Sequence, residues 1–475
     1  MFPAVPDTAD FDLIDLPDDI PAERVRRLND APPNDNGDSV LYWMQASQRT
    51  RHNHALELAI LIANGRKQPL RVCFGLTDGY PEANARHYAF MLEGLRDVAA
   101  NLERRHIGFA LFKGSPADVA IEQAKGASVV VTDMGYVRPC RAWRERVAKK
   151  LECTLVQVES GVVVPVETAS NKREFAARTL RPKIHEHWGA FLKPVKKRSV
   201  KEQSHAWSPK GALDVTDPAR LLESLKVDHD VAPSPIFEGG EDEAQKRLRS
   251  FLKDKLSGYA DGRNEPSRDK HSYMSMYLHF GQISPIELAL AAKDETGGED
   301  TKSFLEELIV RRELAKNFVW FSPDDYDEYK CLPDWAQKTL DEHRDDDRPT
   351  QYTRGELEAA DTDDPYWNAA MWQMKLTGFM HNYMRMYWGK KVLEWCNTPE
   401  YAYKTLLYLN NKFFIDGRDP NSFSNVAWVF GLHDRPWTER PIFGKTRYMN
   451  RNGLDRKFDM EAYVKQIDRL REEHE

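Results

Sequence analysis

Four segments in the second half of the chain carry side chains that could do chemistry. The most unusual is residues 380–395, MHNYMRMYWGKKVLEW, in which Arg385 stands among three Met, two Tyr and two Trp. In a helix, Met384, Trp388 and Trp395 fall on one side. Core packing alone explains such a stripe, but an arginine buried among rings needs a carboxylate, a ligand or water. Closely spaced Trp and Tyr also suit one-electron transfer beside a redox cofactor.

The second segment is residues 259–284, YADGRNEPSRDKHSYMSMYLHFGQIS. It places His271, Ser272 and Ser275 where a helix is predicted to begin. Hydroxyls and free backbone N–H groups at a helix start bind phosphate or pyrophosphate. Simple capping of the helix by Ser272 is the alternative.

The third segment is residues 304–314, FLEELIVRREL. Its apolar face, formed by Leu305, Leu308 and Ile309, is expected to draw Glu307 partly inward. The alternative is a solvated salt-bridge face made of Glu306, Glu307, Arg311 and Arg312.

The fourth segment, residues 409–451, interleaves aromatic and cationic side chains after the turn sequence DGRDPN. The side chains concerned are Trp428, Trp437, Tyr448, Arg435, Arg440, Lys445, Arg447 and Arg451. Aromatic rings stack on bases and cations pair with phosphates. The whole chain has a net charge of −7, so nucleic-acid binding requires a local basic face of this kind.

Two kinds of structural element must position these segments. Short apolar runs at 40–44, 70–76, 107–112, 128–133 and 154–158 alternate with amphipathic helical stretches. This alternation predicts an α/β domain with a doubly wound parallel sheet. Neither Gly-x-Gly-x-x-Gly nor the P-loop pattern occurs, so the sequence does not specify the ligand of this sheet.

Beyond the sheet, the pattern changes to a linker and then to helical periodicity. We therefore predict four regions: an acidic, disordered lead-in over 1–37, an α/β domain over 38–165, a linker over 166–240, and an all-α domain over 241–475.

Composition excludes several classes of protein. The five cysteines are far apart and form no C-x-x-C pair, which argues against a zinc or iron–sulfur site and for a reducing compartment. No run of 18 apolar residues and no secretory signal is present. We expect a monomeric cytoplasmic protein without a metal site, associated with the nucleoid if the organism is bacterial.

Together and in this order, the four segments resemble the DNA photolyase/cryptochrome family, specifically class II cyclobutane pyrimidine dimer photolyases. The likeness runs from about Val40 to Tyr463, and WNAAMWQMKLTGFMHNYMRMYWGKKVLEW and DGRDPNSFSNVAWVFGLHDRPW are its most specific phrases. It implies an antenna-type α/β domain, a linker and a helical FAD-binding domain. The implied activity is light-driven repair of pyrimidine dimers in UV-damaged DNA, by electron transfer from excited, reduced anionic FAD to a flipped-out dimer.

The resemblance also implies roles for individual residues. Contacts to FAD fall on Tyr259, His271, Ser272, Tyr273, Met274, Ser275, Arg385, Asn410, Asp416 and Gly417. Arg385 would pair with Asp416 beside the isoalloxazine ring, and Asn410 would face flavin N5. Electron carriers from the flavin outward would be Trp388, Trp367 and Trp395, with Tyr387 and Tyr352 as auxiliaries.

For the substrate, Glu307 matches the carboxyl that hydrogen-bonds the dimer, with Met386 and Trp428 lining its pocket. Phosphates and the gap in the duplex would be contacted by Arg263, Asn264, Arg435, Trp437 and Arg447. The chain departs from the family at Met276, where a proline is usual, and at Arg311, where an aromatic ring often stacks on the dimer.

Three alternatives stay open at this point: a cryptochrome-like photoreceptor without repair activity, a (6-4) photolyase, and a helical DNA-binding protein that is not an enzyme. The family likeness also allows an antenna chromophore such as 8-hydroxy-5-deazaflavin in the α/β domain, which no motif identifies.

Overall fold

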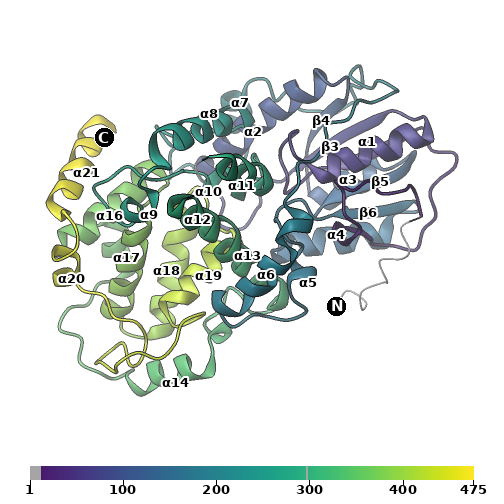
Figure 1. Cartoon of the computed structure of the whole chain (residues 1–475). Helices are drawn as coiled ribbons and strands as arrows, with labels where there is room; N and C mark the ends of the chain where they lie inside the picture. Colours follow the sequence, from purple (N-terminus) through teal and green to yellow (C-terminus); the bar gives the residue numbers. More distant parts are fainter. Residues whose placement is uncertain (1–11, 296–297, 475) are drawn as a thin grey trace.

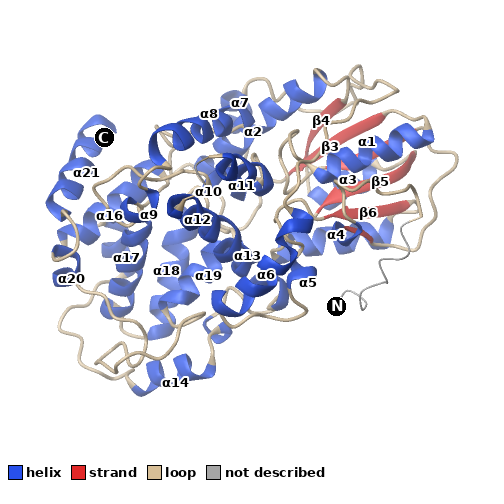
Figure 2. Cartoon of the chain, in the orientation of Figure 1, coloured by secondary structure: helices blue, strands red, loops and turns tan. Residues whose placement is uncertain are grey.

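The computed structural model describes residues 12–295 and 298–474. One side of the molecule in Figure 1 is a sheet covered by helices, and the other side is entirely helical. Figure 2 shows that the strands are confined to the first of these parts. The prediction of an α/β domain followed by an all-α domain is confirmed.

The sheet has six strands in the order β1-β6-β5-β2-β3-β4. The strands are β1 (Val25–Arg27), β2 (Ser39–Trp43), β3 (Leu70–Leu76), β4 (Gly108–Lys113), β5 (Ala127–Asp133) and β6 (Thr154–Val158). All neighbours are parallel except β1, which runs antiparallel to β6. Every residue of β2, β5 and β6 is buried, as expected for a parallel sheet with helices on both faces. The covering helices are α1 (His54–Arg66), α2 (Ala85–Glu103), α3 (Pro116–Gln123) and α4 (Arg138–Lys150).

The prediction of a disordered lead-in is wrong for residues 12–37, and residues 1–11 lie outside the described part of the chain. A short 3-10 turn, η2 (Ala22–Arg24), leads into β1, which extends the sheet. Arg24 is buried, and its guanidinium donates to the carbonyls of Glu159, Val162 and Val163. The acidic composition predicted disorder, but the hydrogen bonds of this buried arginine hold the segment in place.

The linker is packed against the sheet rather than free. It contains α5 (Val166–Ala169), α6 (Ala177–Phe191) and α7 (Pro218–Glu223). Its extended part covers the edge strand β4, because Ser204 accepts from the Gly108 N–H and Leu213 donates to the Leu111 carbonyl. Covering an exposed edge protects it from pairing with other chains.

The helical domain spans the rest of the chain. Its first elements are α8 (Glu241–Ser250), η3 (Phe251–Lys255), α9 (Tyr259–Gly262), α10 (Ser275–His279), α11 (Pro285–Asp294), α12 (Glu299–Leu305), η4 (Glu306–Arg311) and α13 (Arg312–Phe321). The later ones are η5 (Tyr329–Cys331), α14 (Asp334–Glu342), α15 (Arg354–Ala359), α16 (Pro365–Thr377), α17 (Asn382–Trp395), α18 (Pro399–Phe413), α19 (Pro420–Val429), α20 (Arg451–Asp455) and α21 (Met460–His474). Asp364, Thr398 and Asp419 cap α16, α18 and α19 with their side chains. In the described ranges, no helix combines the length and apolar character that a membrane span requires.

A buried arginine joins the two domains. Arg86, near the start of α2, donates to the carbonyls of Met374, Lys375 and Leu376 at the end of α16, and of Phe413 at the end of α18. Burial lowers its pKa only to about 10, so the side chain keeps its charge at neutral pH. A cation at two helix C-termini is favoured by the helix dipoles and gives donors to the terminal carbonyls, of which that of Met374 also accepts from the Gly378 N–H.

Candidate functional site

The helical domain contains a cavity of about 1140 Å³, measured to its open mouth. It lies among α9, α10, η4, the start of α17 and the α18–α19 turn. Ten residues singled out in the sequence line it: Tyr259, Arg263, His271, Ser272, Tyr273, Met274, Ser275, Glu307, Arg385 and Asp416. Its wall combines hydroxyl, imidazole and charged side chains with the rings of Phe304 and Phe379.

Arg385 has the carboxylate partner that its position in α17 requires. Its Nη2 atom lies 3.3 Å from both carboxylate oxygens of Asp416. Its guanidinium carbon lies 3.8 Å from the centre of the Phe414 ring, in a cation–π contact. The charge pair therefore stands at the cavity wall on an aromatic support, with the Arg385 side chain 23% exposed.

The segment 271–275 enters the cavity as a loop rather than as a capped helix. Helix α10 begins only at Ser275, and its N-cap, Met274, makes no side-chain hydrogen bond. The capping role considered for Ser272 is therefore wrong; its Oγ lies 3.4 Å from the Met274 N atom in a local turn. Tyr273 has a positive φ of 57°, which turns the chain along the cavity wall.

Two histidines meet at this end of the cavity. The rings of His271 and His381 are edge-to-face with centres 4.3 Å apart. The Nε2 atoms of both are buried and have no hydrogen-bond partner in the described part of the chain. Burial lowers the pKa of His271 to about 4 and that of His381 to about 2. Unpaired buried polar atoms are uncommon in folded proteins, and here one of the two histidines lines the cavity.

Glu307 lies in a π-helical turn, η4, between α12 and α13. Its Oε1 atom is 3.1 Å from Nη1 of Arg263 across the cavity. The preceding residue, Glu306, points elsewhere and pairs with Arg181 and Arg311. Glu307 therefore faces the cavity as expected, and of the alternative salt-bridge face, which lies within the described residues, only the Glu306–Arg311 pair forms. Single π-turns of this kind occur frequently at functional sites.

The three tryptophans predicted as electron carriers form one contiguous group. Trp367 and Trp388 are stacked with ring centres 6.4 Å apart, and Trp367 and Trp395 are edge-to-face at 5.5 Å. Tyr352 then contacts Trp395 at 5.1 Å and is only partly buried. At the inner end, Trp388 contacts Phe414 at 6.3 Å, so the group runs from the support of Arg385 to the surface. Tyr387 is buried beside it and donates a hydrogen bond to Asp364.

A second group gathers the predicted nucleic-acid contacts of residues 428–447. The guanidinium carbon of Arg447 lies 4.3 Å from the Trp437 ring and 5.5 Å from the Trp428 ring. Arg435 covers Trp437 at 5.2 Å. Asp434 orients the group, because it accepts from Arg447 Nε and from the indole N–H of Trp437. Cations and rings alternate here on a partly exposed surface.

Several predicted residues lie off the cavity wall described above: Asn264, Arg311, Met386, Asn410 and Gly417. Asn410 is 5% exposed and donates its side-chain N–H to Asn411 Oδ1 at 3.0 Å. Close packing explains why residue 417 is a glycine, since a Cβ there would lie 2.9 Å from the carbonyl oxygens of Asn411 and Phe414.

Sequence reasoning missed other lining residues. Three amides, Asn382, Asn421 and Asn425, line the cavity from the start of α17 and from α19. The four-residue spacing of Asn421 and Asn425 on one helix face was the available signal. His279 and Asp419 were also missed; their side chains are 3.2 Å apart.

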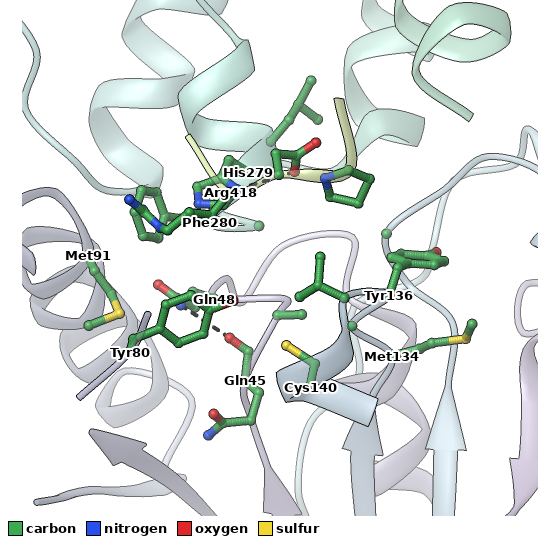
Figure 3. A pocket seen from close by; sticks show the side chains of 18 of the residues that line it. Gln45, Gln48, Tyr80, Met91, Met134, Tyr136, Cys140, His279, Phe280 and Arg418 are labelled. Atoms are coloured by element: carbon green, nitrogen blue, oxygen red, sulfur yellow. Dashed lines mark hydrogen bonds and ion pairs between the residues drawn. The ribbon is translucent and has the colours of Figure 1, made fainter. Parts of the chain in front are cut away.

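A second cavity, of about 1110 Å³, lies between the two domains. Figure 3 shows its wall, with Gln45 and Met134 following β2 and β5 and with Tyr80, Cys140 and Arg418 around it. The carboxyl ends of β2, β3 and β5 meet there, and the connections from the neighbouring strands β2 and β5 run in opposite directions, to β3 and to β6. Such a switch point is the usual ligand site of a doubly wound sheet. Leu278, His279, Arg312 and Asp419 line both cavities.

Sequence comparison identifies the family. A family model described as DNA photolyase matches residues 40–200. A deoxyribodipyrimidine photo-lyase of Methanothermobacter thermautotrophicus is 50% identical over 96% of this chain and 100% of its own. One from Oryza sativa is 40% identical over 91% of this chain and 88% of its own. This chain belongs to the DNA photolyase family.

Solved structures show the same fold at lower identity. A class III photolyase from Agrobacterium tumefaciens has a TM-score of 0.69 at 20% identity, covering 91% of this chain and 86% of its own. An archaeal photolyase from Sulfolobus tokodaii, described with two FAD molecules, has a TM-score of 0.69 at 16% identity, covering 90% and 89%. The photolyase fold therefore extends over both domains of this member of the family.

The buried histidines predict acid sensitivity. Because the folded-state pKa of His381 lies below the ordinary value of 6.5, the unfolded chain binds the proton first. Its stabilising contribution is complete above pH 6.5 and is lost as the pH falls below that value. The variant His381→Asn keeps the N-cap acceptor of α17 but cannot titrate. We expect it to reduce the pH slope of the unfolding free energy by about 1 kcal/mol per pH unit between pH 6 and 4.

Urea unfolding at a series of pH values measures this slope. His205→Asn is the control, because His205 is exposed. An unchanged slope in His381→Asn would contradict the burial of a neutral histidine at this position.

Proposed function

We propose that this chain is a deoxyribodipyrimidine photo-lyase, an enzyme that repairs cyclobutane pyrimidine dimers in DNA under light. The observation that carries the proposal is one cavity whose wall contains the Arg385–Asp416 pair and Glu307, with the tryptophan group behind it. This arrangement occurs in a chain that is 50% identical to a photolyase over nearly its whole length. The rival proposal, a photoreceptor without repair activity, gives Glu307 no role.

The residues present fit FAD as the cofactor. Hydroxyls and the Arg385–Asp416 pair line one cavity, and His271 offers a ligand an unpaired buried nitrogen there. Ser272 and Ser275 would hold the phosphates and ribityl chain, and Arg385 with Asp416 would hold the ring end. When bound, FAD in its reduced anionic form supplies the photoexcited electron that splits the dimer, and the electron returns, so no net oxidation occurs.

The substrate side of the cavity is then assigned to Glu307 and Arg263. Their ion pair is partly exposed, with side chains 34% and 23% accessible, so a flipped base can reach both. Glu307 would orient the dimer by a hydrogen bond to its carbonyl edge, where negative charge develops. Met386 and Trp428 would bound the dimer, and Asn410 would face flavin N5.

DNA binding is assigned to the cationic and aromatic group around Trp437. Arg435, Trp437 and Arg447, with Arg263 and Asn264 near the cavity, would contact the phosphates and fill the space left by the flipped nucleotides. Arg311 would present its planar face where relatives often have a ring. The partner is UV-damaged DNA, and we propose a monomer that acts in the cytoplasm, at the nucleoid if the organism is bacterial.

The finer assignment is to class II of the photolyases. Its support is the pair of phrases WNAAMWQMKLTGFMHNYMRMYWGKKVLEW and DGRDPNSFSNVAWVFGLHDRPW, and the tryptophan group that the first phrase places on α16 and α17. In this assignment Trp388, Trp367 and Trp395 carry electrons between the cofactor and the surface, with Tyr387 and Tyr352 as auxiliaries.

The cavity between the domains is proposed as the site of an antenna chromophore. Its position at the switch point of the sheet and its apolar and aromatic wall suit a flat heteroaromatic ring such as a deazaflavin. Tyr80 and Trp143, with ring centres 6.0 Å apart, stand at this wall.

The activity is tested by incubating the purified, FAD-loaded protein with a dimer-containing oligonucleotide under blue light and in darkness. We expect the protein to restore pyrimidines under blue light and not in darkness, since the reaction needs a photon for each electron transferred. Repair in the dark, or none in light with reduced FAD bound, would refute the proposed activity.

Glu307→Ala tests the substrate side. We expect repair to fall about ten-fold, because a hydrogen bond to a charged group contributes ~1.5 kcal/mol, while the bound FAD content stays unchanged. Glu306→Ala is the matched control, since that neighbouring carboxylate pairs with Arg181 and Arg311 rather than across the cavity. Loss of FAD from Glu307→Ala would show that the residue belongs to the cofactor site.

Trp388→Phe tests the electron path. We expect photoreduction of the oxidised flavin to become much slower while repair by enzyme reduced beforehand persists, because only the first process needs electrons from the surface. Trp372→Phe is the control: this ring is stacked between Lys375 and Arg471, away from the group. Equal losses of photoreduction and repair would contradict the assigned role.

A further inference from the structure

The loop Ser170–Ala176, which joins α5 to α6, is held rigidly although it lies at the surface. Asn317 of α13 pairs with its backbone on both sides, donating to the Lys172 carbonyl at 2.9 Å and accepting from the Glu174 N–H at 2.7 Å. The Glu174 side chain accepts from Ser170 at 2.6 Å. Three internal anchors thus fix the path of the loop.

This loop is also tied to the segment that carries Arg435 and Trp437. The Nδ1–H of His433 donates to the Phe175 carbonyl at 2.8 Å. Burial lowers the pKa of His433 to about 4, so the ring is neutral at physiological pH. The hydrogen bond therefore does not depend on protonation, and the loop and the Trp437 segment are held side by side.

The side chain of Phe175 projects from this anchored loop. It is 45% exposed, and only three other large hydrophobic side chains in the described ranges are comparably exposed: Ile236, Trp437 and Tyr448. Two of those, Trp437 and Tyr448, belong to the aromatic and cationic segment already assigned to DNA. Phe175 is therefore a third exposed ring on a segment that is hydrogen-bonded to the one carrying Trp437.

The charges around Phe175 are positive. Residues 172–183 contain five cations and one carboxylate. Three of the cations are engaged: Arg173 donates to the Cys331 carbonyl, Arg181 pairs with Glu306 and Lys183 with Glu174.

The other two cations, Lys172 and Arg178, are exposed, and neither has a carboxylate partner in the part of the chain that the structure describes. The Arg178 guanidinium carbon lies 5.7 Å from the Phe175 ring. An exposed ring with an arginine over it also occurs at Trp437, where the Arg435 guanidinium lies 5.2 Å from the ring.

We propose that Lys172, Phe175 and Arg178 form a second DNA-contacting arm, next to the Trp437 group. Phe175 stacks on a base or packs on a sugar, and the two cations contact backbone phosphates. The proposal rests on the proposed function, because it extends the DNA surface of the same enzyme from the helical domain onto the connection between the domains. The DNA would then contact both the segment that carries Arg435 and Trp437 and this loop.

Two variants separate the two contributions. Phe175→Ala is expected to weaken binding of a dimer-containing duplex about ten-fold without changing its salt dependence, since a stacked ring carries no charge. The double variant Lys172→Ala/Arg178→Ala is expected to lower the slope of log K against log salt by about 1.8, the loss of two phosphate contacts. Phe175→Tyr should retain the affinity of the unaltered protein.

The chain offers matched controls. Ile236→Ala removes an equally exposed apolar side chain at a distant site, and Lys149→Ala/Lys150→Ala removes two exposed lysines from α4 in the α/β domain. Both should bind DNA as the unaltered protein does. Unchanged affinity in Phe175→Ala together with an unchanged salt slope in the double variant would overturn the arm and leave the surface to an acidic protein partner.

The outcome is separable from that of the proposed function. If the unaltered protein binds and repairs damaged DNA but the variants match it, the arm alone fails. If the protein repairs nothing, the proposed function fails, and the salt slope on undamaged duplex decides the arm: a reduced slope in the double variant supports it, and an equal slope or no binding refutes it.

Discussion

The geometry of one wall of the cavity in the helical domain depends on one buried cation, Arg86. Its guanidinium spans the C-termini of α16 and α18, and His87 beside it donates to the Phe414 carbonyl. Helix α18 carries Asn410, and the turn after it carries Asp416, the partner of Arg385. These residues belong to the helical domain, yet the α/β domain supplies the hydrogen-bond donors for the carbonyls at the ends of both helices. Without a cation there, the carbonyls of Lys375, Leu376 and Phe413 would lose this donor at an interdomain contact, at a cost of about 1–3 kcal/mol each.

The wall between the two cavities is a second feature to which both domains contribute. Asp419 caps α19 and accepts from both His279 and Lys316. Lys316 lowers the pKa of Asp419 despite its burial, and burial lowers the pKa of Lys316 to about 8. Arg312 stands at the same wall and donates to the Gly161 carbonyl of the α/β domain. Ligands in the two cavities would therefore face opposite sides of one charged, hydrogen-bonded wall.

Much of the fold was predictable because the patterns involved are local. Short apolar runs predicted all of the parallel strands, because burial on both faces gives a strand a continuous apolar run. Helical periodicity predicted the second half, because burial on one face gives a helix a repeat. The prediction of disorder in the lead-in was wrong because the hydrogen bonds of a single buried arginine, Arg24, tie this segment to the sheet. A single residue leaves no periodic pattern in the sequence. Helix α6 was predicted as part of the linker because Pro182, which usually interrupts a helix, lies inside it.

For the site, the sequence by itself determined which side chains are available: an arginine among oxidisable rings, a carboxylate on an apolar helix face, and rings interleaved with cations. It even required a partner for Arg385, since a buried guanidinium cannot stay unpaired. The family resemblance named Asp416 as this partner, and the tertiary structure brings the two side chains together. Only the tertiary structure decided that a π-turn sends Glu307 and Glu306 to different sides, and that Phe175 lies beside His433. Those contacts join residues 31 to 258 positions apart, or depend on an irregular helical turn. Local periodicity carries no information about either.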